Sequence, residues 1–382
     1  MDLYEYQGKS LFARVGVPVP EGRLAHTVAE AKAGALDLGG PVVIKAQVQV
    51  GGRGKAGGIK LAADHDEAAI HAEAILGMDI KGHIVHRVWV ERASDIKHEY
   101  YASFTLDRGA KKHLAMVSAQ GGVDIEGVAA TDPDAVVKVH IDPVIGLTEW
   151  QARQLVYQAK LDPAIARPAA VTLRKLYAAF VELDCDLVEV NPLIVTGDNE
   201  VVALDAKVTI DSNALYRHPD FAEFSETFVV DPIEKMATDR GLNFIKLDGS
   251  VGIMANGAGL AMATLDVVDL VGGAAANFLD VGGSADADTV IDALEVLTQD
   301  ENVGAVLINI FGGIVRCDLV AEGIVEAMTR MELPWPLVVR LDGTNAIEAR
   351  AILDEKAAGK IIPAATMREG AEKAVALAKG AE

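Results

Sequence analysis

The chain has 382 residues, of which 51% are hydrophobic and 24% are charged. This length is large for one hydrophobic core and predicts two or three domains of ordinary globular composition. The formal net charge of −21 disfavours nucleic acid and anionic membrane surfaces as partners, because both would be repelled by the overall field of the chain.

The expected compartment follows from segments that the sequence lacks. The first residues, MDLYEYQGKS, show no basic start followed by an apolar stretch, so we expect no signal peptide. No apolar run approaches the roughly 18 residues of a membrane span, so we expect no membrane association. The two cysteines, Cys185 and Cys317, lie in separate patterns and indicate a reduced, cytoplasmic protein.

The segment 42–62, VVIKAQVQVGGRGKAGGIKLA, predicts two strands joined by a basic, glycine-rich loop. Lys45 stands alone in the apolar first strand, and the loop contains Arg53 and Lys55. Glycine N–H groups can surround phosphates because no Cβ obstructs them. The Walker pattern fails, since Gln49 stands where a glycine is needed and a strand rather than a helix follows. The alternative is a solvent-exposed hairpin with Lys45 on an edge strand.

The segment 87–108, RVWVERASDIKHEYYASFTLDR, places three polar residues near a predicted strand end. Glu91 ends the strand, and Ser94 and Glu99 are expected in the polar loop after it. Side chains at such a hinge can hold the amine and ribose of a nucleotide. The alternative is an ordinary connection between two strands.

The segment 187–207, LVEVNPLIVTGDNEVVALDAK, predicts a hairpin around TGDNE. If the hairpin is centred on Asp198, Glu189 lies opposite Lys207 across the two strands. Pro192 cannot donate a ladder hydrogen bond and therefore predicts a bulge or an edge.

The same register places Asn191 opposite Asp205, and alternation puts both on the face that carries Glu189. Amide and carboxylate oxygens grouped in this way suit Mg²⁺ that is shared with nucleotide phosphates. The alternative is a solvated outer face of an antiparallel sheet, on which polar residues normally alternate with apolar ones.

The chain changes character near residue 240. Before about residue 235, short hairpins and scattered helices predict an α+β domain with antiparallel sheets, and 211–245 looks like the connection between two halves. After it, short apolar runs alternate with amphipathic segments, which predicts a doubly wound parallel sheet. The predicted strands of this second half are 251–255, 276–280, 305–310, 337–341 and 360–364.

The stretch 307–324, LINIFGGIVRCDLVAEGI, predicts a strand, a glycine turn and a helix N-terminus, which together favour anion binding. No Lys or Ser/Thr follows the glycines, so a Walker loop is excluded. All nine histidines lie at or before His218, which leaves the second half without a histidine general base or phosphorylatable imidazole. Cys317, near the helix start, is expected to be buried, although the helix N-terminus would lower its pKa.

A dinucleotide-binding dehydrogenase or a nucleotide-sensing module is an alternative for the doubly wound domain. Gly257 and Gly259 fit the first two glycines of the G-x-G-x-x-G fingerprint. Met262 occupies the third position, where close packing of helix and strand requires Gly or Ala. The fingerprint is therefore incomplete.

The sequence resembles the β subunits of succinate–CoA ligases from its first residue nearly to its last. The motifs that carry this resemblance are MDLYEYQGKSLF, KAQVQVGGRGKAGG, EVNPL with ALDAK, NALYRHPD, NGAGLAM, NFLDVGG and NIFGGIVRCD. The resemblance implies an N-terminal ATP-grasp domain at 1–236 and a flavodoxin-like CoA-ligase domain at 237–382. The sequence departs from the family pattern at Ser284, where a third glycine is common.

The resemblance also implies roles for individual positions. Lys45 and the loop Gly52, Arg53 and Gly54 would hold nucleotide phosphates, and Glu91, Ser94 and Glu99 would lie on the adenosine side. Asn191 and Asp205 would bind Mg²⁺, and Glu189 would meet a phosphohistidine of an α subunit. Asn256, Gly313, Ile314 and Val315 would bind substrate or phosphate at the subunit interface.

The implied reaction couples cleavage of ATP to ADP with formation of succinyl-CoA from succinate, through an acyl phosphate. An α subunit would carry the phosphoryl group on a histidine and bind most of the CoA, in an αβ or α₂β₂ assembly. Pro20 resembles the ATP-using members. Malate–CoA ligase is the alternative, but its interface segment reads more like FAGIN, whereas this chain has FGGIV.

Overall fold

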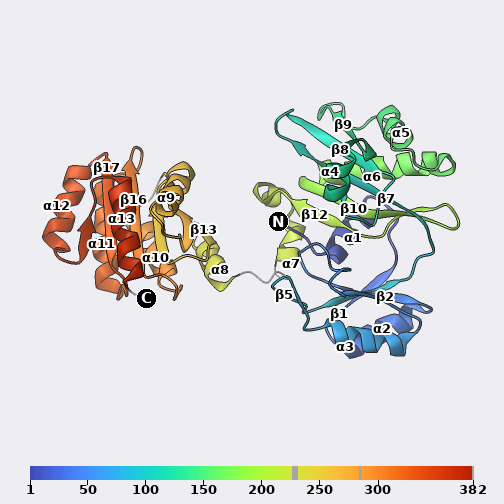
Figure 1. Cartoon of the computed structure of the whole chain (residues 1–382), viewed down its shortest axis with the longest axis horizontal. Helices are drawn as coiled ribbons and strands as arrows, with labels where there is room; N and C mark the ends of the chain where they lie inside the picture. Colours follow the sequence, from blue (N-terminus) through green and yellow to red (C-terminus); the bar gives the residue numbers. More distant parts are fainter. Residues whose placement is uncertain (226–230, 284–285, 381–382) are drawn as a thin grey trace. The chain divides into compact units, whose positions relative to one another are not determined.

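The computed structural model describes residues 1–225, 231–283 and 286–380. The chain divides into two compact units, Met1–Phe228 and Val229–Glu382 (Figure 1). The boundary predicted after residue 236 falls within α8 (Pro232–Asp239). The predicted connection at 211–245 includes residues 226–230, and these, like Ser284, lie outside the described residues. No helix in the described ranges is both long and apolar enough to cross a membrane.

The first unit contains a four-stranded antiparallel sheet in the order β1 (Gly22–Ala25), β6 (Val88–Arg92), β2 (Val42–Ala46) and β3 (Ile59–Ala62). Helices α2 (Val28–Leu38) and α3 (His65–Ile75) cover one face (Figure 1), and each begins at a side-chain cap. The predicted strand–loop–strand at 42–62 is confirmed. The edge-strand alternative is wrong, because β2 lies between β6 and β3 and Lys45 is buried.

The other sheet of this unit has six strands and is also antiparallel. Its order is β11 (Val201–Ala203), β10 (Cys185–Thr196), β7 (Ile96–Asp107), β8 (Lys112–Ser118) and β9 (Val136–Ile141), and β12 (Lys207–Ile210) also pairs with β10. Helices α5 (Glu149–Gln158) and α6 (Ala166–Glu182) contribute to its core, in which Phe104, Leu155 and Leu173 are fully buried.

Helix α1 (Glu5–Arg14) lies between the two sheets of the first unit in Figure 1. Its apolar residues Leu11 and Phe12 belong to the core of the six-stranded sheet, whereas its polar residues Glu5 and Lys9 contact β2 and β6. The helix therefore places charged groups between the two sheets, where apolar side chains would otherwise be expected to pack. The remaining elements are β4 (Asp79–Ile80), β5 (His83–Ile84), α4 (Ile125–Thr131), α7 (Ala222–Ser225) and four 3₁₀ turns at Pro133–Ala135, Pro163–Ile165, Ser212–Arg217 and Pro219–Phe221.

The second unit is a six-stranded sheet in the order β13 (Asn243–Lys246), β15 (Asn277–Asp280), β14 (Val251–Ala255), β16 (Ala305–Gly312), β17 (Leu337–Gly343) and β18 (Ile361–Pro363). The five predicted strands are present and parallel, and their order is the flavodoxin-like one. Strand β13 was not predicted; it pairs antiparallel with β15 and makes the sheet mixed.

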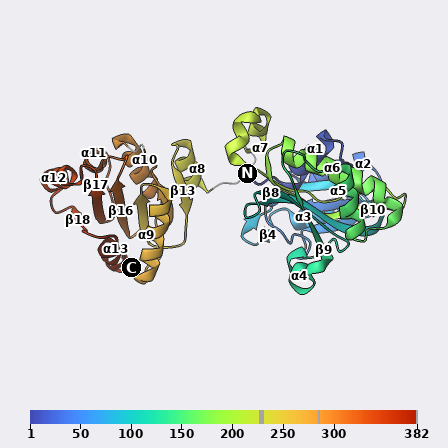
Figure 2. The same cartoon turned by 90° about the horizontal axis from the view of Figure 1, so that it is seen from above.

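Helices cover both faces of this sheet. Figure 2 shows α10 (Ala287–Leu297), α11 (Cys317–Arg330) and α12 (Ala346–Lys356) on one face and α9 (Ala258–Leu270) with α13 (Met367–Lys379) on the other. Two separate apolar clusters correspond to these faces. This layering leaves the turns after β14, β15, β16 and β17 at the carboxyl edge, where doubly wound sheets bind ligands.

At the carboxyl edge, the last residues of the neighbouring strands β16 and β17, Gly312 and Gly343, lie in close contact. Gly343 has a φ of 90°, and a Cβ added there would lie 2.1 Å from the carbonyl oxygen of Gly312. Gly359 has a φ of 77° and no atom within 4 Å of such a Cβ. Gly359→Ala therefore adds only backbone strain, about 1 kcal/mol, while Gly343→Ala adds overpacking worth about 2 kcal/mol more.

Hydrogen exchange of peptides covering residues 305–345 in the full chain measures this difference. We expect markedly faster exchange in Gly343→Ala and near wild-type exchange there in Gly359→Ala. Equal protection in the two variants would contradict the close approach of the two strand ends.

Candidate functional site

Six charged side chains of the first unit form one connected group, called the ion cluster below. Its members are Glu5, Lys9, Lys45, Arg53, Glu91 and Asp205. All except Asp205 are at least nine-tenths buried at the side chain, and Asp205 is 33% exposed. Buried charges persist only when they are paired and hydrogen-bonded, and three cations here meet three carboxylates.

Lys45 is at the centre of this cluster. Its Nζ lies 2.9 Å from Oε1 of Glu5, 2.7 Å from Oε1 of Glu91 and 2.8 Å from the carbonyl oxygen of Leu204. Burial by itself would lower the pKa of Lys45, but the two carboxylates raise it above its usual value. The two carboxylates therefore favour the charged ammonium of Lys45 in this buried position.

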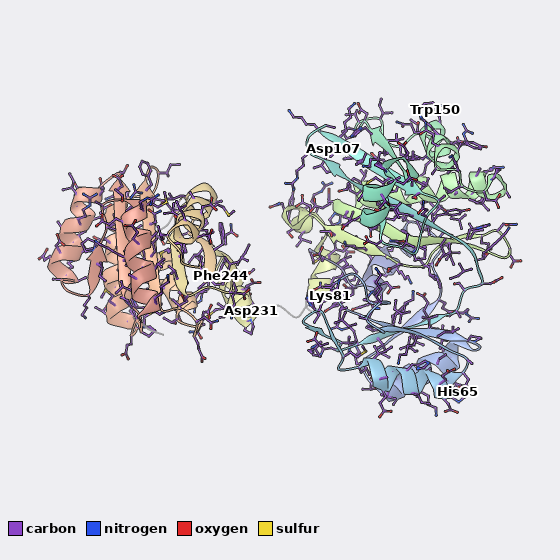
Figure 3. The ribbon with its side chains drawn as sticks, in the orientation of Figure 1. His65, Lys81, Asp107, Trp150, Asp231 and Phe244 are labelled. Atoms are coloured by element: carbon purple, nitrogen blue, oxygen red, sulfur yellow. The ribbon has the colours of Figure 1, made fainter. Side chains whose placement is uncertain are left out.

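Arg53 connects the glycine loop to the cluster. One guanidinium nitrogen donates to Oε2 of Glu5 at 2.6 Å and the other to Oδ1 of Asp205 at 2.9 Å. The loop folds back on itself, since the N–H of Gly58 donates to the carbonyl oxygen of Arg53. Lys81, labelled in Figure 3, places a further cation beside the glycine loop. A Cβ added to Gly52 would lie 3.3 Å from the Nζ of Lys81.

The three predicted adenosine-side residues are in different environments. Glu91 is fully buried; its Oε2 accepts from Trp89 Nε1 at 3.0 Å and forms a short ion pair with Lys9. Ser94 is half-buried in the loop after β6. Glu99 lies within β7 rather than in that loop, so its predicted placement was wrong; its carboxylate lies close to Gly122.

The predicted hairpin register is confirmed where the strands pair. Glu189 lies opposite Lys207, and Val195 lies opposite Val201. The ladder between β10 and β7 shifts between Val190 and Leu193, in agreement with the bulge predicted at Pro192.

Asn191 and Asp205 fall outside the paired stretches. The Oδ1 of Asn191 accepts from the N–H of Gly122 at 2.8 Å, and its Nδ2 donates to the carbonyl oxygen of Val123 at 2.9 Å. Oδ1 of Asp205 accepts from Arg53 and from the N–H of Ala206. Both side chains offer the hard oxygen atoms that Mg²⁺ prefers. Among the described residues, no three His, Cys, Asp or Glu side chains group closely enough to hold a metal ion.

Glu189 is half-buried and accepts a hydrogen bond of 3.1 Å from the hydroxyl of Tyr101. Burial raises the pKa of the Glu189 carboxyl above its usual value, although Lys207 and Tyr101 act in the opposite direction. The carboxylate is thus held by one neutral donor, while the charge of Lys207 acts on it electrostatically. It remains suited to receive a cation from outside.

In the second unit, the predicted site residues lie at the carboxyl edge of the sheet. The amide of Asn256, directly after β14, binds both main-chain groups of Phe311: Oδ1 accepts from its N–H at 2.8 Å and Nδ2 donates to its carbonyl oxygen at 2.9 Å. Gly313 and Ile314 are exposed in the turn before α11, whereas Val315 is buried in the core.

Cys317 begins α11 and is fully buried, as predicted. The predicted lowering of its pKa was wrong. Burial raises the pKa of this thiol, and hydrogen bonds with main-chain groups of Gly312 and Asp342 compensate only in part. The desolvation of a thiolate outweighs the helix N-terminus here, so Cys317 is a structural residue.

Comparisons with known proteins cover both units. Residues 2–195 match the family described as ATP-grasp domain, and residues 254–375 match the family described as CoA-ligase. A protein of Chloroflexus aurantiacus named succinate–CoA ligase [ADP-forming] subunit beta is 51% identical over 381 residues, a coverage of 100% for both chains. A protein of Natronomonas pharaonis with the same name is 53% identical over 93% of each chain.

The chain belongs to the family of succinate–CoA ligase β subunits. A third protein with that name, from Rubrobacter xylanophilus, is 49% identical over 99% of both chains. The solved structure of an ATP citrate lyase from Methanothrix soehngenii is similar in fold, with a TM-score of 0.75 at 18% identity, over 98% of this chain and 99% of that one. An ATP-grasp domain followed by a CoA-ligase domain, as the resemblance implied, is therefore the fold of this succinate–CoA ligase β-subunit family member.

Two members of the ion cluster were missed by sequence reasoning, namely Glu5 and Lys9. They lie one turn apart on α1, as i and i+4, and form a pair of 2.7 Å. The available signal was a polar stripe in YEYQGKS next to an apolar one, but such a stripe usually marks a solvated helix face. Tyr101, the partner of Glu189, gave no signal beyond its place in a strand.

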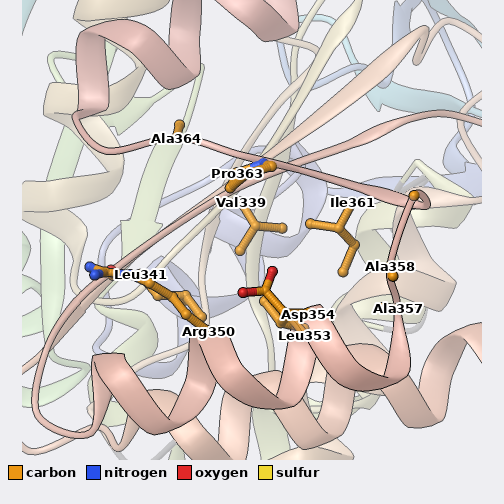
Figure 4. A pocket seen from close by; sticks show the side chains of 11 residues that line it. Val339, Leu341, Arg350, Leu353, Asp354, Ala357, Ala358, Ile361, Pro363 and Ala364 are labelled. Atoms are coloured by element: carbon orange, nitrogen blue, oxygen red, sulfur yellow. The ribbon is translucent and has the colours of Figure 1, made fainter.

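A cavity of about 80 Å³ lies elsewhere, between α12 and the strands β17 and β18 (Figure 4). Val339, Leu353 and Ile361 contribute apolar walls, and Arg350 and Asp354 contribute charge. None of the predicted site residues lines it.

The pKa of Glu5 makes the stability of the first unit depend on pH. Burial would raise the pKa of the Glu5 carboxyl, but the charges of Lys45, Lys9 and Arg53 hold it well below its usual value. A lowered carboxyl pKa adds stability above the unfolded-state pKa of about 4.3, and this stability is lost as the pH falls further. Glu5→Gln should therefore lower the free energy of unfolding at pH 7 by about 3 kcal/mol relative to the wild type. This difference between variant and wild type should become smaller as the pH falls below about 4.3.

Urea unfolding followed by tryptophan fluorescence at pH 7 and in acid measures this difference. Glu149→Gln is the matched control, because Glu149 and Arg153 form the same i, i+4 pair at the start of α5 but are exposed. Glu149→Gln should lower the free energy of unfolding by less than about 0.5 kcal/mol. A pH-independent effect of Glu5→Gln would show that its charge does not stabilise the fold.

Proposed function

We propose that this chain is the nucleotide-binding β subunit of an ADP-forming succinate–CoA ligase. The proposed reaction converts ATP, succinate and CoA reversibly to ADP, phosphate and succinyl-CoA through succinyl phosphate and a phosphohistidine of an α subunit. The observation that carries this proposal is the identity of about half of all residues, over the full chain, to the β subunits of such ligases. The ion cluster supports it, because two of its cations are the proposed phosphate ligands.

The proposed phosphate site consists of Lys45 and the loop residues Gly52, Arg53 and Gly54. Phosphoryl transfer needs cations and N–H donors fixed around spreading negative charge. Lys45 is fixed by three oxygen contacts on an interior strand, and Arg53 reaches the same place from the loop. Glu91, Ser94 and Glu99 remain the proposed adenosine-side residues.

We assign Asn191 and Asp205 to Mg²⁺, since their oxygens match its ligand preference. Bound there, the ion would neutralise charge on the nucleotide phosphates. Asp205 has one carboxylate oxygen on Arg53, and Asn191 is held by two hydrogen bonds to the 122–123 turn. The turn thus orients the amide oxygen without help from the metal.

Glu189 is proposed to receive the histidine of the α subunit, whose protonated imidazole would be favoured by the carboxylate. Asn256, Gly313, Ile314 and Val315 are proposed to serve the substrate and phosphate in the CoA-ligase domain, with CoA bound mainly by the α subunit in an αβ or α₂β₂ complex. The second unit contains no histidine, which agrees with a phosphoryl carrier supplied by a partner.

Malate–CoA ligase remains the rival activity. The side chain of Val315 is apolar and offers no hydrogen bond to an additional substrate hydroxyl, and this favours succinate. Assays of the reconstituted complex with succinate and malate in parallel decide between them.

The proposal predicts that the purified chain binds Mg-ATP but releases no ADP in response to succinate and CoA until an α subunit is added. Lys45→Met should weaken Mg-ATP binding by at least tenfold, because a charge-assisted hydrogen bond contributes about 1.5–3 kcal/mol. Titration calorimetry and an ADP-release assay measure the two properties.

Lys60→Met is the control for this experiment, since Lys60 lies on the neighbouring strand β3 outside the ion cluster. Its Mg-ATP affinity should equal that of the wild type. Full turnover by the chain alone would refute the subunit assignment.

A separate prediction concerns Glu189. Glu189→Gln keeps the size of the side chain and removes its charge, so the complex with the α subunit should assemble while histidine phosphorylation by ATP is lost. Gel filtration and detection of acid-labile phosphate measure assembly and phosphorylation. Phosphorylation at the wild-type rate would remove Glu189 from the proposed mechanism.

A further inference from the structure

Glu5 is the most highly connected anion of the ion cluster, and neither the sequence motifs nor the proposed mechanism gives it a role. It is the first residue of α1, and its side chain is 1% exposed. Its Oε1 accepts from Lys9 at 2.7 Å and from Lys45 at 2.9 Å, while its Oε2 accepts from Arg53 at 2.6 Å. One carboxylate thus contacts all three cations.

The two proposed phosphate ligands already donate to protein oxygens, and one nitrogen of Arg53, Nη1, donates both of its hydrogens. The ammonium of Lys45 donates hydrogen bonds to Glu5 and to the carbonyl oxygen of Leu204, and it forms an ion pair of 2.7 Å with Glu91. Arg53 donates to Glu5, to the carbonyl oxygen of Ala46 and to Asp205. A phosphate can therefore gain Nη1 of Arg53 only if Glu5 or the carbonyl oxygen of Ala46 releases it.

The charges of the cluster show which acceptor can be exchanged. Three carboxylates and three cations sum to zero, so the site is neutral as it stands. Glu91 is fully buried between two lysines, and its release would leave an unpaired charge in the interior. Glu5 holds Arg53 through one oxygen and the lysines through the other, so it can release Arg53 and stay paired.

We propose that Glu5 is a positioning residue that stands in for a nucleotide phosphate. It holds Lys45 and Arg53 in place, and an incoming phosphate takes over the Arg53 bond from Oε2 while Oε1 keeps the lysines. The inference rests on the proposed nucleotide site. The ligand class is a nucleoside diphosphate or triphosphate, and Glu5 competes with its phosphate for one guanidinium.

The test is titration calorimetry of the full chain with ADP in EDTA, so that no metal contributes. A competing anion lowers affinity, and Glu5→Gln replaces a charged acceptor of Arg53 by a neutral one. We expect Glu5→Gln to bind metal-free ADP about tenfold more tightly than the wild type. A structural defect alone would weaken binding, so the sign of the change identifies the role.

A second variant keeps the test decisive if Glu5→Gln does not fold. Glu5→Gln combined with Lys9→Met removes one charge of each sign, keeps the cluster neutral and still frees Arg53 from a carboxylate. It should also bind metal-free ADP more tightly. Glu149→Gln, the exposed counterpart on α5, should bind like the wild type.

Unchanged or weaker ADP binding in folded Glu5→Gln or in the double variant would overturn the inference. Tighter binding in Glu5→Gln but not in the double variant would also overturn it, because the gain would then come from net charge. Failure of the proposed function is seen separately, as a wild-type chain that binds neither Mg-ATP nor Mg-ADP.

Discussion

Three buried cations can stay close together only if carboxylates lie between them, and this electrostatic constraint organises the first unit. Glu5, Glu91 and Asp205 come from α1, β6 and the segment between β11 and β12. Lys45 and Arg53 come from β2 and its loop. The cluster therefore ties together one helix, the two interior strands of the smaller sheet, a glycine loop and the β11–β12 segment of the larger sheet. None of these elements could move far without leaving a buried charge unpaired.

The same constraint explains why a phosphate site can exist between two sheets at all. Cations gathered for a polyanion would repel one another in the interior, where the effective dielectric constant is low. Internal carboxylates remove that repulsion, and the glycines of the loop let its backbone lie close to the cations without side-chain obstruction. Function and stability are thus served by one set of ion pairs.

Much of this arrangement could be predicted from the sequence, for identifiable reasons. The alternation of apolar and polar residues, together with the turn residues, predicted β2, β3 and the register that places Glu189 opposite Lys207. These features were predictable because both signals depend on residues close together in the sequence. Strand β13 was missed because it is a short edge strand. Glu99 was misplaced because β7 begins at Ile96, where tertiary pairing with β10 overrides a polar sequence.

The ion cluster itself was beyond sequence reasoning. Lys45 and Arg53 could be singled out as cations near glycines, but their anionic partners come from residues 5, 91 and 205, which no local pattern relates. The pKa of Cys317 shows the same limit: the helix N-terminus was visible in the sequence, whereas the burial that outweighs it was not.

The break in the ladder of β10 has a mechanical consequence. Glu189 stays in register with Lys207, while two residues later Asn191 has left the pairing and is held by the turn at 122–123. Neighbouring positions of one strand are thereby anchored to different parts of the domain. A shift of the turn would move the amide oxygen of Asn191 and leave the carboxylate of Glu189 in place. The proposed metal ligand and the proposed histidine acceptor can thus be adjusted independently, although only one residue separates them.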